Sequence, residues 1–412
     1  MSLAKNPELA RRDLPEWKTW GPYLSERQWG TVREDYSQDG SAWEYFSHEH
    51  ARSRAYRWGE DGIAGISDNK QLLCFAPAFW NGEDEIIKER FFGLTGNEGI
   101  HGEDVKEVYY YLDNTPTHSF MRALYKYPQQ AFPYAQLKAE NLKRTKKDPE
   151  FELIDTGIFD QDRYFDIFIE YAKSGPEDIL IRLRAINRGP EAAILRLIPQ
   201  FWFRNTWAWN AAETKPELSS LEPGLLFAQH HELGNYYIHY EDSAEALFCN
   251  NDTNVVKCFN WESQHIPVKD GINDYVTNGI RTGLNNKARG TKAGLLYVCP
   301  VPSGAEYSIR LRMSRKTQRA AFSDFEAIFA ERERDSKQFY APLQQEIVDP
   351  EQKRIHHLAL SGLLWSKQFY FFDVDQWING DSAQPSPPEI RRNGRNSAWQ
   401  HLHNHQIIAM PD

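Results

Sequence analysis

Between about Gly30 and Met313 the chain consists of short apolar or alternating runs separated by Gly, Pro, Asn and Asp. Alternation with a period of two is typical of a β-strand with one buried face, and these separating residues favour turns. The runs with this pattern are residues 105–112, 164–171, 179–187, 193–203, 225–229, 236–240, 246–249, 294–298 and 305–313. Amphipathic helices do not separate them, so the sequence predicts a mainly β domain with antiparallel strands.

The connections between these runs have the chemistry of tight turns. Asn187-Arg188-Gly189-Pro190 follows one run, and Ser303-Gly304 precedes another, so neighbouring runs are expected to form hairpins. An immunoglobulin-like sandwich needs only about 100 residues, and this region is far longer. We therefore expect an N-terminal arm over residues 1–20, followed by a large two-sheet domain, a super-β-sandwich, over residues 21–315.

The pattern becomes helical after Met313. Apolar residues recur at helical spacing from Phe322 to Phe329, with charged residues 331–334 on the polar side, which predicts a linker helix within residues 316–346. A second helix is expected to begin near Pro350 and to lead into the aromatic run 369–372. Residues 347–412 cannot bury such a helix alone, so we expect them to lie on the sandwich, on another chain or on a continuation of this one.

Composition argues against several classes of protein. The net charge of -10, with acids flanking the basic run at residues 143–147, gives no footprint for nucleic acid. No apolar run is long enough to span a membrane, and the N-terminus lacks the apolar segment of a signal peptide, which predicts a cytoplasmic protein. The four cysteines match no zinc pattern and are interpreted as buried thiols; no metal or other cofactor is expected.

Two segments in the first quarter of the chain combine acids, a cation and aromatic residues in turn-prone sequence. The candidate ligand-binding or domain-interface residues are Trp58, Glu60 and Asp61 in the first segment and His101, Glu103, Asp104 and Lys106 in the second. Acids on bends beside a flat aromatic wall suit a neutral, hydroxyl-rich ligand such as a sugar. The alternative is that these acids pair with Arg54 or Arg57 and that the rings belong to the core.

Other motifs receive structural interpretations. The glycine-rich residues 93–99 are not followed by the lysine and helix of a phosphate loop. His48 with His50, and His356 with His357, lack further ligands at metal spacing and are interpreted as surface or interface histidines. Three tryptophans after a predicted strand are expected to pack in the core rather than stack on sugar: Trp202, Trp207 and Trp209.

The string WGPYLSERQWGTVREDY at residues 20–36 resembles the start of bacterial proteins related to glycoside hydrolase family 63. Four further segments are similar to the same group: RWGEDGI at 57–63, HGEDVKE at 101–107, LDNTPTHS at 112–119 and FWFRNTW at 201–207. The resemblance implies a super-β-sandwich, of the galactose mutarotase-like or glucoamylase N-domain-like kind, joined by helices to an (α/α)6 toroid. It also implies hydrolysis of α-glucosidic or related bonds with inversion.

Inverting hydrolysis uses one carboxylic acid to protonate the leaving oxygen and a second carboxylate to activate water, typically about 6.5 to 9.5 Å away. The resemblance places both residues in the toroid, beyond Asp412, so no residue of this chain is assigned a catalytic role. We expect an N-terminal, largely non-catalytic portion that scaffolds a toroid supplied in cis or in trans and closes its sugar pocket. A truncated product, a split subunit and a gene fragment all satisfy this expectation.

Two other functions stay open from the sequence. A carbohydrate-binding module would hold an oligosaccharide for a partner hydrolase without chemistry of its own. A mutarotase-like sugar epimerase would use His101 and Glu103 as its acid and base. Hydrolysis by this chain alone would require its acid and base among Glu60, Asp61, Glu103 and Asp104.

Overall fold

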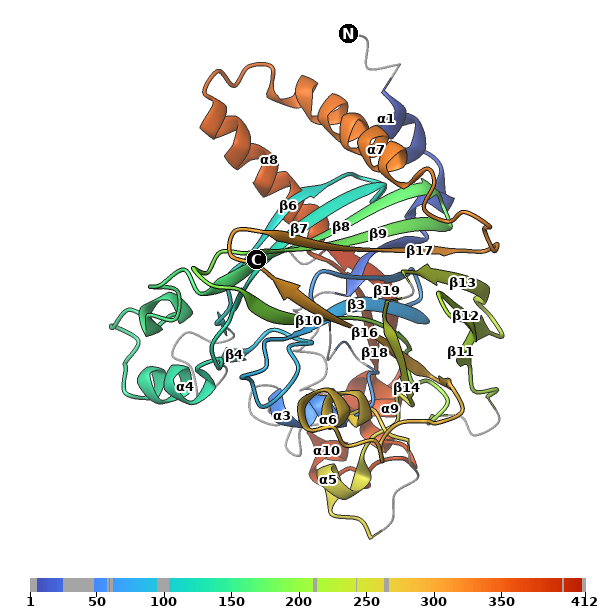
Figure 1. Cartoon of the computed structure of the whole chain (residues 1–412). Helices are drawn as coiled ribbons and strands as arrows, with labels where there is room; N and C mark the ends of the chain where they lie inside the picture. The colour runs from blue at the N-terminus through green and yellow to red at the C-terminus, as the bar shows by residue number, and fades with distance from the viewer. Residues whose placement is uncertain are drawn as a thin grey trace.

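The computed structural model describes residues 6–24, 48–57, 59, 62–94, 104–209, 213–241, 243–262, 267–394 and 396–409. Within these residues, six strands form one antiparallel sheet (Figure 1). Its order is β1 (Trp20–Leu24), β2 (Gly65–Asp68), β3 (Leu73–Trp80), β10 (Ala193–Phe203), β16 (Lys292–Val301) and β14 (Glu245–Cys249). The chain is thus mainly β, as the sequence predicts.

A second antiparallel sheet has nine strands among the described residues. Its order is β15 (Arg289–Gly290), β11 (Glu217–Glu222), β12 (Leu225–His230), β13 (Gly234–Tyr240), β17 (Glu306–Ser314), β9 (Asp178–Asn187), β8 (Tyr164–Gly175), β7 (Phe120–Pro128) and β6 (Tyr109–Asn114). Several sequential strands pair as hairpins, for example β7 with β8, β8 with β9 and β12 with β13. The hairpins expected at the two turns named from the sequence are wrong, because residues 188–190 lead from β9 to β10 and residues 303–304 lead from β16 to β17, and each of these connections passes from one sheet to the other.

The two sheets share one hydrophobic core. Phe75 and Phe201 of the six-stranded sheet and Tyr171 and Leu183 of the nine-stranded sheet are fully buried in the same cluster. The rings of Phe75 and Phe201 lie 4.8 Å apart, and Phe75 meets the edge of Tyr171 at 6.1 Å. Alternate residues of each strand therefore point into one layer between the sheets, which follows from the period of two in the sequence.

Most predicted strands are present with similar bounds, and residues 193–203 agree at both ends with β10. The prediction for residues 105–112 is wrong in part, because the chain turns between β5 (Asp104–Val105) and β6. Several strands escaped the sequence pattern, including β3 and β7. The burial of β3 is nearly continuous, so the period of two that marks a half-exposed strand is missing there.

The predicted linker helix is α7 (Phe325–Tyr340), which lies across the outer face of the nine-stranded sheet. Its residues Phe325 and Phe329 are buried against Phe120 and Leu180. The short N-terminal helix α1 (Pro7–Arg12) packs on α7, where Arg11 forms a 2.7 Å ion pair with Asp335. The N-terminal arm is therefore tied to the linker.

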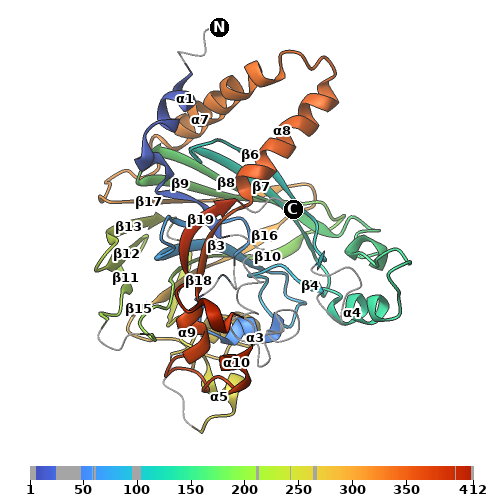
Figure 2. The ribbon, with the colours of Figure 1, turned by 180° about the vertical axis from the view of Figure 1, so that it is seen from behind.

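The second predicted helix is α8 (Pro350–Trp365), but its expected continuation into the aromatic run is wrong. The helix ends at Trp365, and residues 367–373 form β18 (Lys367–Asp373), which pairs with β19 (His403–Ala409). Aromatic residues favour strands, and the pairing satisfies the backbone groups of a tail that the sequence alone left without a partner. β18 packs beside β1, and Figure 2 shows α9 (Val374–Asn379) below the β18–β19 ribbon.

Short helices cover the other face of the six-stranded sheet. They include α3 (His48–Ser53), α5 (Val255–Phe259) and α6 (Gly271–Asn278). At the start of α6, Gly271 lies so close to Gly283 that a Cβ on Gly271 would sit 2.2 Å from the carbonyl oxygen of Gly283. A peripheral subdomain carries α4 (Tyr134–Leu142). Among the described residues, no helix has both the length and the apolar character needed to cross a membrane.

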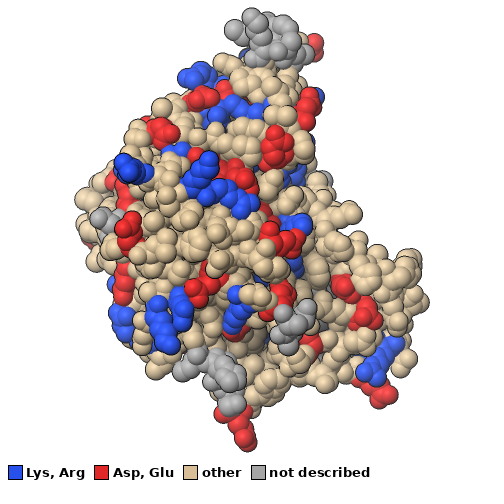
Figure 3. Space-filling model, turned by 90° about the vertical axis from the view of Figure 1, so that its right-hand side faces the viewer, with Lys and Arg blue, Asp and Glu red and all other residues tan. Residues whose placement is uncertain are grey.

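Charged side chains are mixed on the face drawn in Figure 3, where Lys and Arg lie among Asp and Glu. Some of these charges form closed clusters: the buried carboxylate of Glu170 accepts hydrogen bonds of 2.7 to 2.8 Å from Arg122, Arg182 and Arg184. Glu170 on β8 thus links arginines of the neighbouring strands β7 and β9, and Arg182 and Arg184 have further acidic partners in Glu326 and Glu306.

Candidate functional site

The two segments predicted to form a site are attached to the same stretch of chain, residues 88–94. On one side, the backbone N–H of Gly62 donates to the carbonyl oxygen of Glu89 at 3.1 Å. On the other, β4 (Gly93–Leu94) pairs with β5, and the N–H of Lys106 donates to the oxygen of Phe92 at 2.8 Å. Segments some forty residues apart in sequence are therefore attached to the same short stretch of chain.

The predicted site residues themselves are placed only in part. Trp58, Glu60, Asp61, His101 and Glu103 lie outside the described residues, and Asp104 is described only as the first residue of β5.

Lys106 is placed in full and is buried, 1% exposed. Its Nζ contacts Glu150 at 2.6 Å and Glu152 at 3.1 Å. Lys106 therefore anchors the second segment to residues 150–152. Because it is buried and paired there, its role is to position the segment rather than to contact a ligand.

Arg57, the predicted alternative partner of the local acids, reaches a distant carboxylate. It is 1% exposed, and its Nη1 lies 2.7 Å from Oδ2 of Asp381. The guanidinium also lies 5.7 Å from the ring centre of Trp209. Arg57 therefore connects the first segment to the residues that follow α9, a link of 324 positions that sequence reasoning had no signal to find.

A cluster of buried polar side chains lies beneath the stretch 88–94. Glu89 contacts Arg90 at 3.0 Å through Oε1, and through Oε2 it contacts Lys292 at 3.2 Å and Gln200 at 3.4 Å. All four are at most 5% exposed. Gln200 and Lys292 alternate with the core residues Phe201 and Ala293, so they point to the face of the six-stranded sheet opposite the shared core.

The preceding residue of the stretch enters a second charge pair. Lys88 contacts Oε1 of Glu107 at 2.7 Å, and Glu107 also accepts from the N–H of Phe92 and the hydroxyl of Tyr125. Burial opposes the charge of Lys88, but Glu107 and Tyr134 raise its pKa to about 12. Glu107, the partner of Lys88, is also buried. Burial disfavours its carboxylate more than the charge of Lys88 favours it, so the pKa of Glu107 is raised. Consecutive residues 88 and 89 thus fix the stretch from both sides.

This arrangement is suited to holding polar groups in place. Carboxylate, guanidinium, ammonium and amide groups converge beneath residues 88–94, where they are buried and bonded to one another. The cluster therefore fixes the position of this stretch and of the two segments attached to it.

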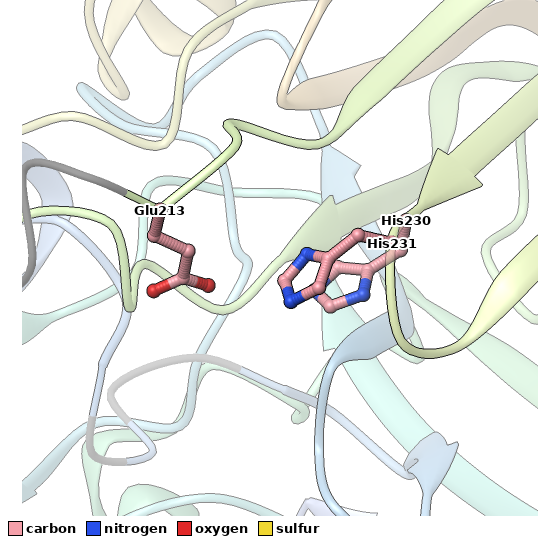
Figure 4. A group of neighbouring side chains, drawn as sticks. All are labelled: Glu213, His230 and His231. Atoms are coloured by element: carbon pink, nitrogen blue, oxygen red, sulfur yellow. The ribbon is translucent and has the colours of Figure 1, made fainter.

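Figure 4 shows a group that sequence reasoning missed, Glu213 with His230 and His231. The ligand atoms of the three residues lie within 4.8 Å of one another, and zinc bonds of about 2.0 to 2.2 Å would require them to close further. The Nδ1 of His230 accepts the backbone N–H groups of Glu232 and Leu233 at 3.1 and 3.2 Å.

The hydrogen bonds to His230 decide what this group can bind. Burial lowers the pKa of His230 to about 4, so its ring is neutral, and with Nδ1 accepting, the proton resides on Nε2. A metal at Nε2 would require that proton to move to Nδ1, at the expense of both backbone hydrogen bonds. The donor set in this arrangement fits a metal poorly and is better suited to hydrogen bonding with Glu213.

The histidines considered from the sequence have aromatic or polar partners. His48 packs edge-on against Phe92 at 5.3 Å, which ties α3 to the stretch 88–94. His357 lies 3.3 Å from Asp113, whereas His356 contacts Gln344. The two members of this adjacent pair therefore face different partners.

Of the three tryptophans expected in the core, Trp202 is buried, whereas Trp207 and Trp209 are only partly buried. Trp202 is buried against Tyr56, and Trp209 stacks on Phe371 of β18 at 5.3 Å. Trp207 donates through Nε1 to Asp252 at 2.9 Å.

Three of the four cysteines are buried, and Cys258 is partly buried. All are free thiols. Burial raises the pKa of Cys249 and Cys299 to about 12, which makes both poor nucleophiles at neutral pH.

In sequence, the chain is similar to a known protein that is much longer. No family model matches the chain. It is 41% identical over 444 aligned positions to the uncharacterized protein YMR196W of Saccharomyces cerevisiae, in an alignment that covers 96% of this chain and 41% of that protein. The chain therefore spans about two-fifths of the length of the curated relative it matches.

Among the solved structures to which the chain is similar is a provisionally named kojibiose phosphorylase from the human microbiome. It aligns with a TM-score of 0.24 and 10% identity, over 76% of this chain and 37% of that one. A score this low does not establish a common fold. The chain is thus similar along nearly its whole length to the yeast protein, which is more than twice as long.

Proposed function

We propose that this chain is the N-terminal β-rich portion of a longer glycoside hydrolase related to family 63. In this proposal its two sheets form the super-β-sandwich, and α7 and α8 lead towards an (α/α)6 toroid that supplies the catalytic carboxylates. The observation that carries the proposal is the convergence of both candidate segments on residues 88–94, above the buried Glu89 cluster. This edge would close one side of the sugar pocket.

The length of the yeast relative supports a role within a larger protein, because nearly three-fifths of that protein lies outside the alignment. The exposed side of α8 supports a docked neighbour. Ile355 is 55% exposed, Leu363 is 49% exposed, and Val348 just before the helix is 90% exposed. Several exposed apolar side chains within one short segment favour a surface that a neighbour covers. We propose that the toroid packs there.

Hydrolysis of a panel of α-glucosides and gluco-oligosaccharides tests this proposal. The chain would be assayed alone and after mixing with the remaining part of the yeast relative. We expect hydrolysis in the mixture and none with the chain alone. Hydrolysis by the chain alone would refute the non-catalytic role and would direct mutagenesis to Glu60, Asp61, Glu103 and Asp104.

Replacing Trp58 with Ala tests the pocket within the active mixture, with the buried packing residue Trp202 left unchanged. We expect KM for oligosaccharides to rise about tenfold or more, as loss of an aromatic contact to a sugar ring would cause. Unchanged kinetic constants would place the first segment outside the pocket. Binding of oligosaccharide by the chain alone, without activity in the mixture, would instead support a carbohydrate-binding module.

A further inference from the structure

Three lysines converge on one buried histidine at the junction of the N-terminal arm, β1 and the β18–β19 ribbon. His118 is fully buried, and its Nε2 lies 3.1 Å from Nζ of Lys367. Its Nδ1 lies 2.9 Å from the side-chain oxygen of Asn114, which accepts, so Nε2 is the atom that accepts from Lys367. Burial, followed by the charges of Lys367, Lys173 and Lys18, holds the pKa of His118 well below its usual value.

Lys173 completes the group from β8. It is 1% exposed, and its Nζ donates to the carbonyl oxygens of Trp17, Trp20 and Thr117 at 2.7, 2.6 and 3.0 Å. The nearby carboxylate of Glu8 offsets part of its charge. All three of its protons are thus used within the protein.

Lys367 and Lys18 are not compensated in this way. No carboxylate of the described residues forms an ion pair with either of them. Burial, together with the charge of Lys18, lowers the pKa of Lys367 to about 8. Two cations that repel one another are therefore held close together without a counter-charge, an arrangement that an anion would stabilise.

A cavity of about 360 Å³ opens at these two lysines. Its lining consists of Arg12, Asp13, Pro15, Lys18, Tyr23, Asn69, Lys367 and Ile407.

Asp13 is the acid in this lining, and it contacts the neighbouring Arg12 at 3.3 Å at the exposed rim. Asp68, next to Asn69, is buried, and its oxygens accept the backbone N–H groups of Lys70, Leu72 and Leu73. Asp13 and Asp68 thus have these other partners, and within the described residues neither forms an ion pair with Lys18 or Lys367.

We propose that this cavity binds a small oxyanion, a phosphate or the phosphate group of a small phosphorylated molecule, between Lys18 and Lys367. The anion would accept hydrogen bonds from Lys367, whose remaining protons are not used by His118, and from Lys18 at the mouth, with Arg12 at the rim. It would bridge the turn of 3-10 helix η2 (Pro15–Lys18) and β18, two elements that lie 349 positions apart. The site lies apart from residues 88–94.

Isothermal titration calorimetry with inorganic phosphate, at constant ionic strength in chloride, tests the proposal. The variants are Lys18→Met, which changes an exposed side chain, and Lys367→Met. The matched control is Lys146→Met, which removes an exposed lysine from another loop. We expect saturable binding by the unmodified chain and by the control, weakened about tenfold or more in each site variant, as loss of a charge-assisted hydrogen bond implies.

Titrations with glucose 6-phosphate and with glucose form a second part of the experiment. They distinguish a site for free phosphate from a site for the phosphate group of a larger molecule. Binding of both phosphates, but not of glucose, would identify a site for the anion itself. Binding of glucose 6-phosphate alone would identify a site for a phosphate monoester. Absence of saturable binding, or equal weakening in Lys146→Met, would overturn the proposal. Lys18→Met keeps the test decisive if Lys367→Met does not fold.

Discussion

Replacement of Lys173 by Met should remove a pH dependence of stability that this buried lysine imposes. Burial, first, and the charge of Lys367 lower the pKa of Lys173 from 10.5 to about 7, although Glu8 opposes the shift. In the unfolded chain the lysine stays protonated up to its ordinary pKa. Between pH 7 and pH 10 the unfolded state therefore binds more protons than the folded state, and the free energy of unfolding rises with pH.

The magnitude follows from the size of the shift. One pKa unit corresponds to about 1.36 kcal/mol, and titration of a group with a folded pKa near 7 contributes about 2 kcal/mol between pH 7 and pH 9. The Met variant should lack this rise. At pH 9, where the amine is neutral in the folded protein, the Met variant should be the less stable of the two, because the carbonyl oxygens of Trp17, Trp20 and Thr117 lose their shared donor.

Urea unfolding followed by tryptophan fluorescence at several values between pH 7 and pH 9 measures this effect. The difference in unfolding free energy between the unmodified chain and Lys173→Met should grow by about 2 kcal/mol across this range. Lys146→Met, which removes an exposed lysine, should give a constant difference. Parallel curves for the unmodified chain and Lys173→Met would refute the reasoning, since they would show that Lys173 keeps its ordinary pKa in the folded protein.

Three further substitutions test the packing of the frame. Glu170→Gln should lower the free energy of unfolding by about 3 kcal/mol, because three arginines lose a buried partner; urea midpoints measure it. Trp365→Ala should cost about 3 to 5 kcal/mol and expose α8 to limited proteolysis, because Trp365 stacks on Tyr111 at 4.9 Å and donates to the oxygen of Asp113. Gly271→Ala should cost about 2 to 3 kcal/mol, measured by thermal unfolding, because its Cβ would overlap Gly283.

Each of these substitutions has a control of the same residue type or in the same helix, at a more exposed or less crowded position. Glu333→Gln removes a partly exposed carboxylate 3.8 Å from Arg122 and should cost less than about 1 kcal/mol. Leu363→Ala changes an exposed position of α8, and Gly175→Ala adds a Cβ that meets no atom within 4 Å. A control as destabilised as its test variant would contradict the assigned contact.

The sequence indicates two candidate segments for a site, but it does not show how they are attached to the rest of the chain. Glycines beside acids marked residues 57–62 and 101–107 as loops that carry polar groups. Their shared attachment to residues 88–94 depends on backbone hydrogen bonds between segments that are distant in sequence. The buried Glu89–Lys292 contact joins residues 203 positions apart, and no local pattern encodes such a pairing.

The sequence by itself determined the β character of the chain, many of its strands and the linker helix, because alternation with a period of two and apolar spacing near 3.6 residues are local properties. It did not determine that residues 369–372 form a strand, since an aromatic run carries neither period and the pairing partner lies beyond residue 402. Only the tertiary structure decided which charges meet: Arg57 with Asp381, and Lys367 with His118. Contacts of this kind form when elements that are distant in sequence pack together. Packing removes water from each charged group, and the free energy of that group then depends on the partners that replace the water.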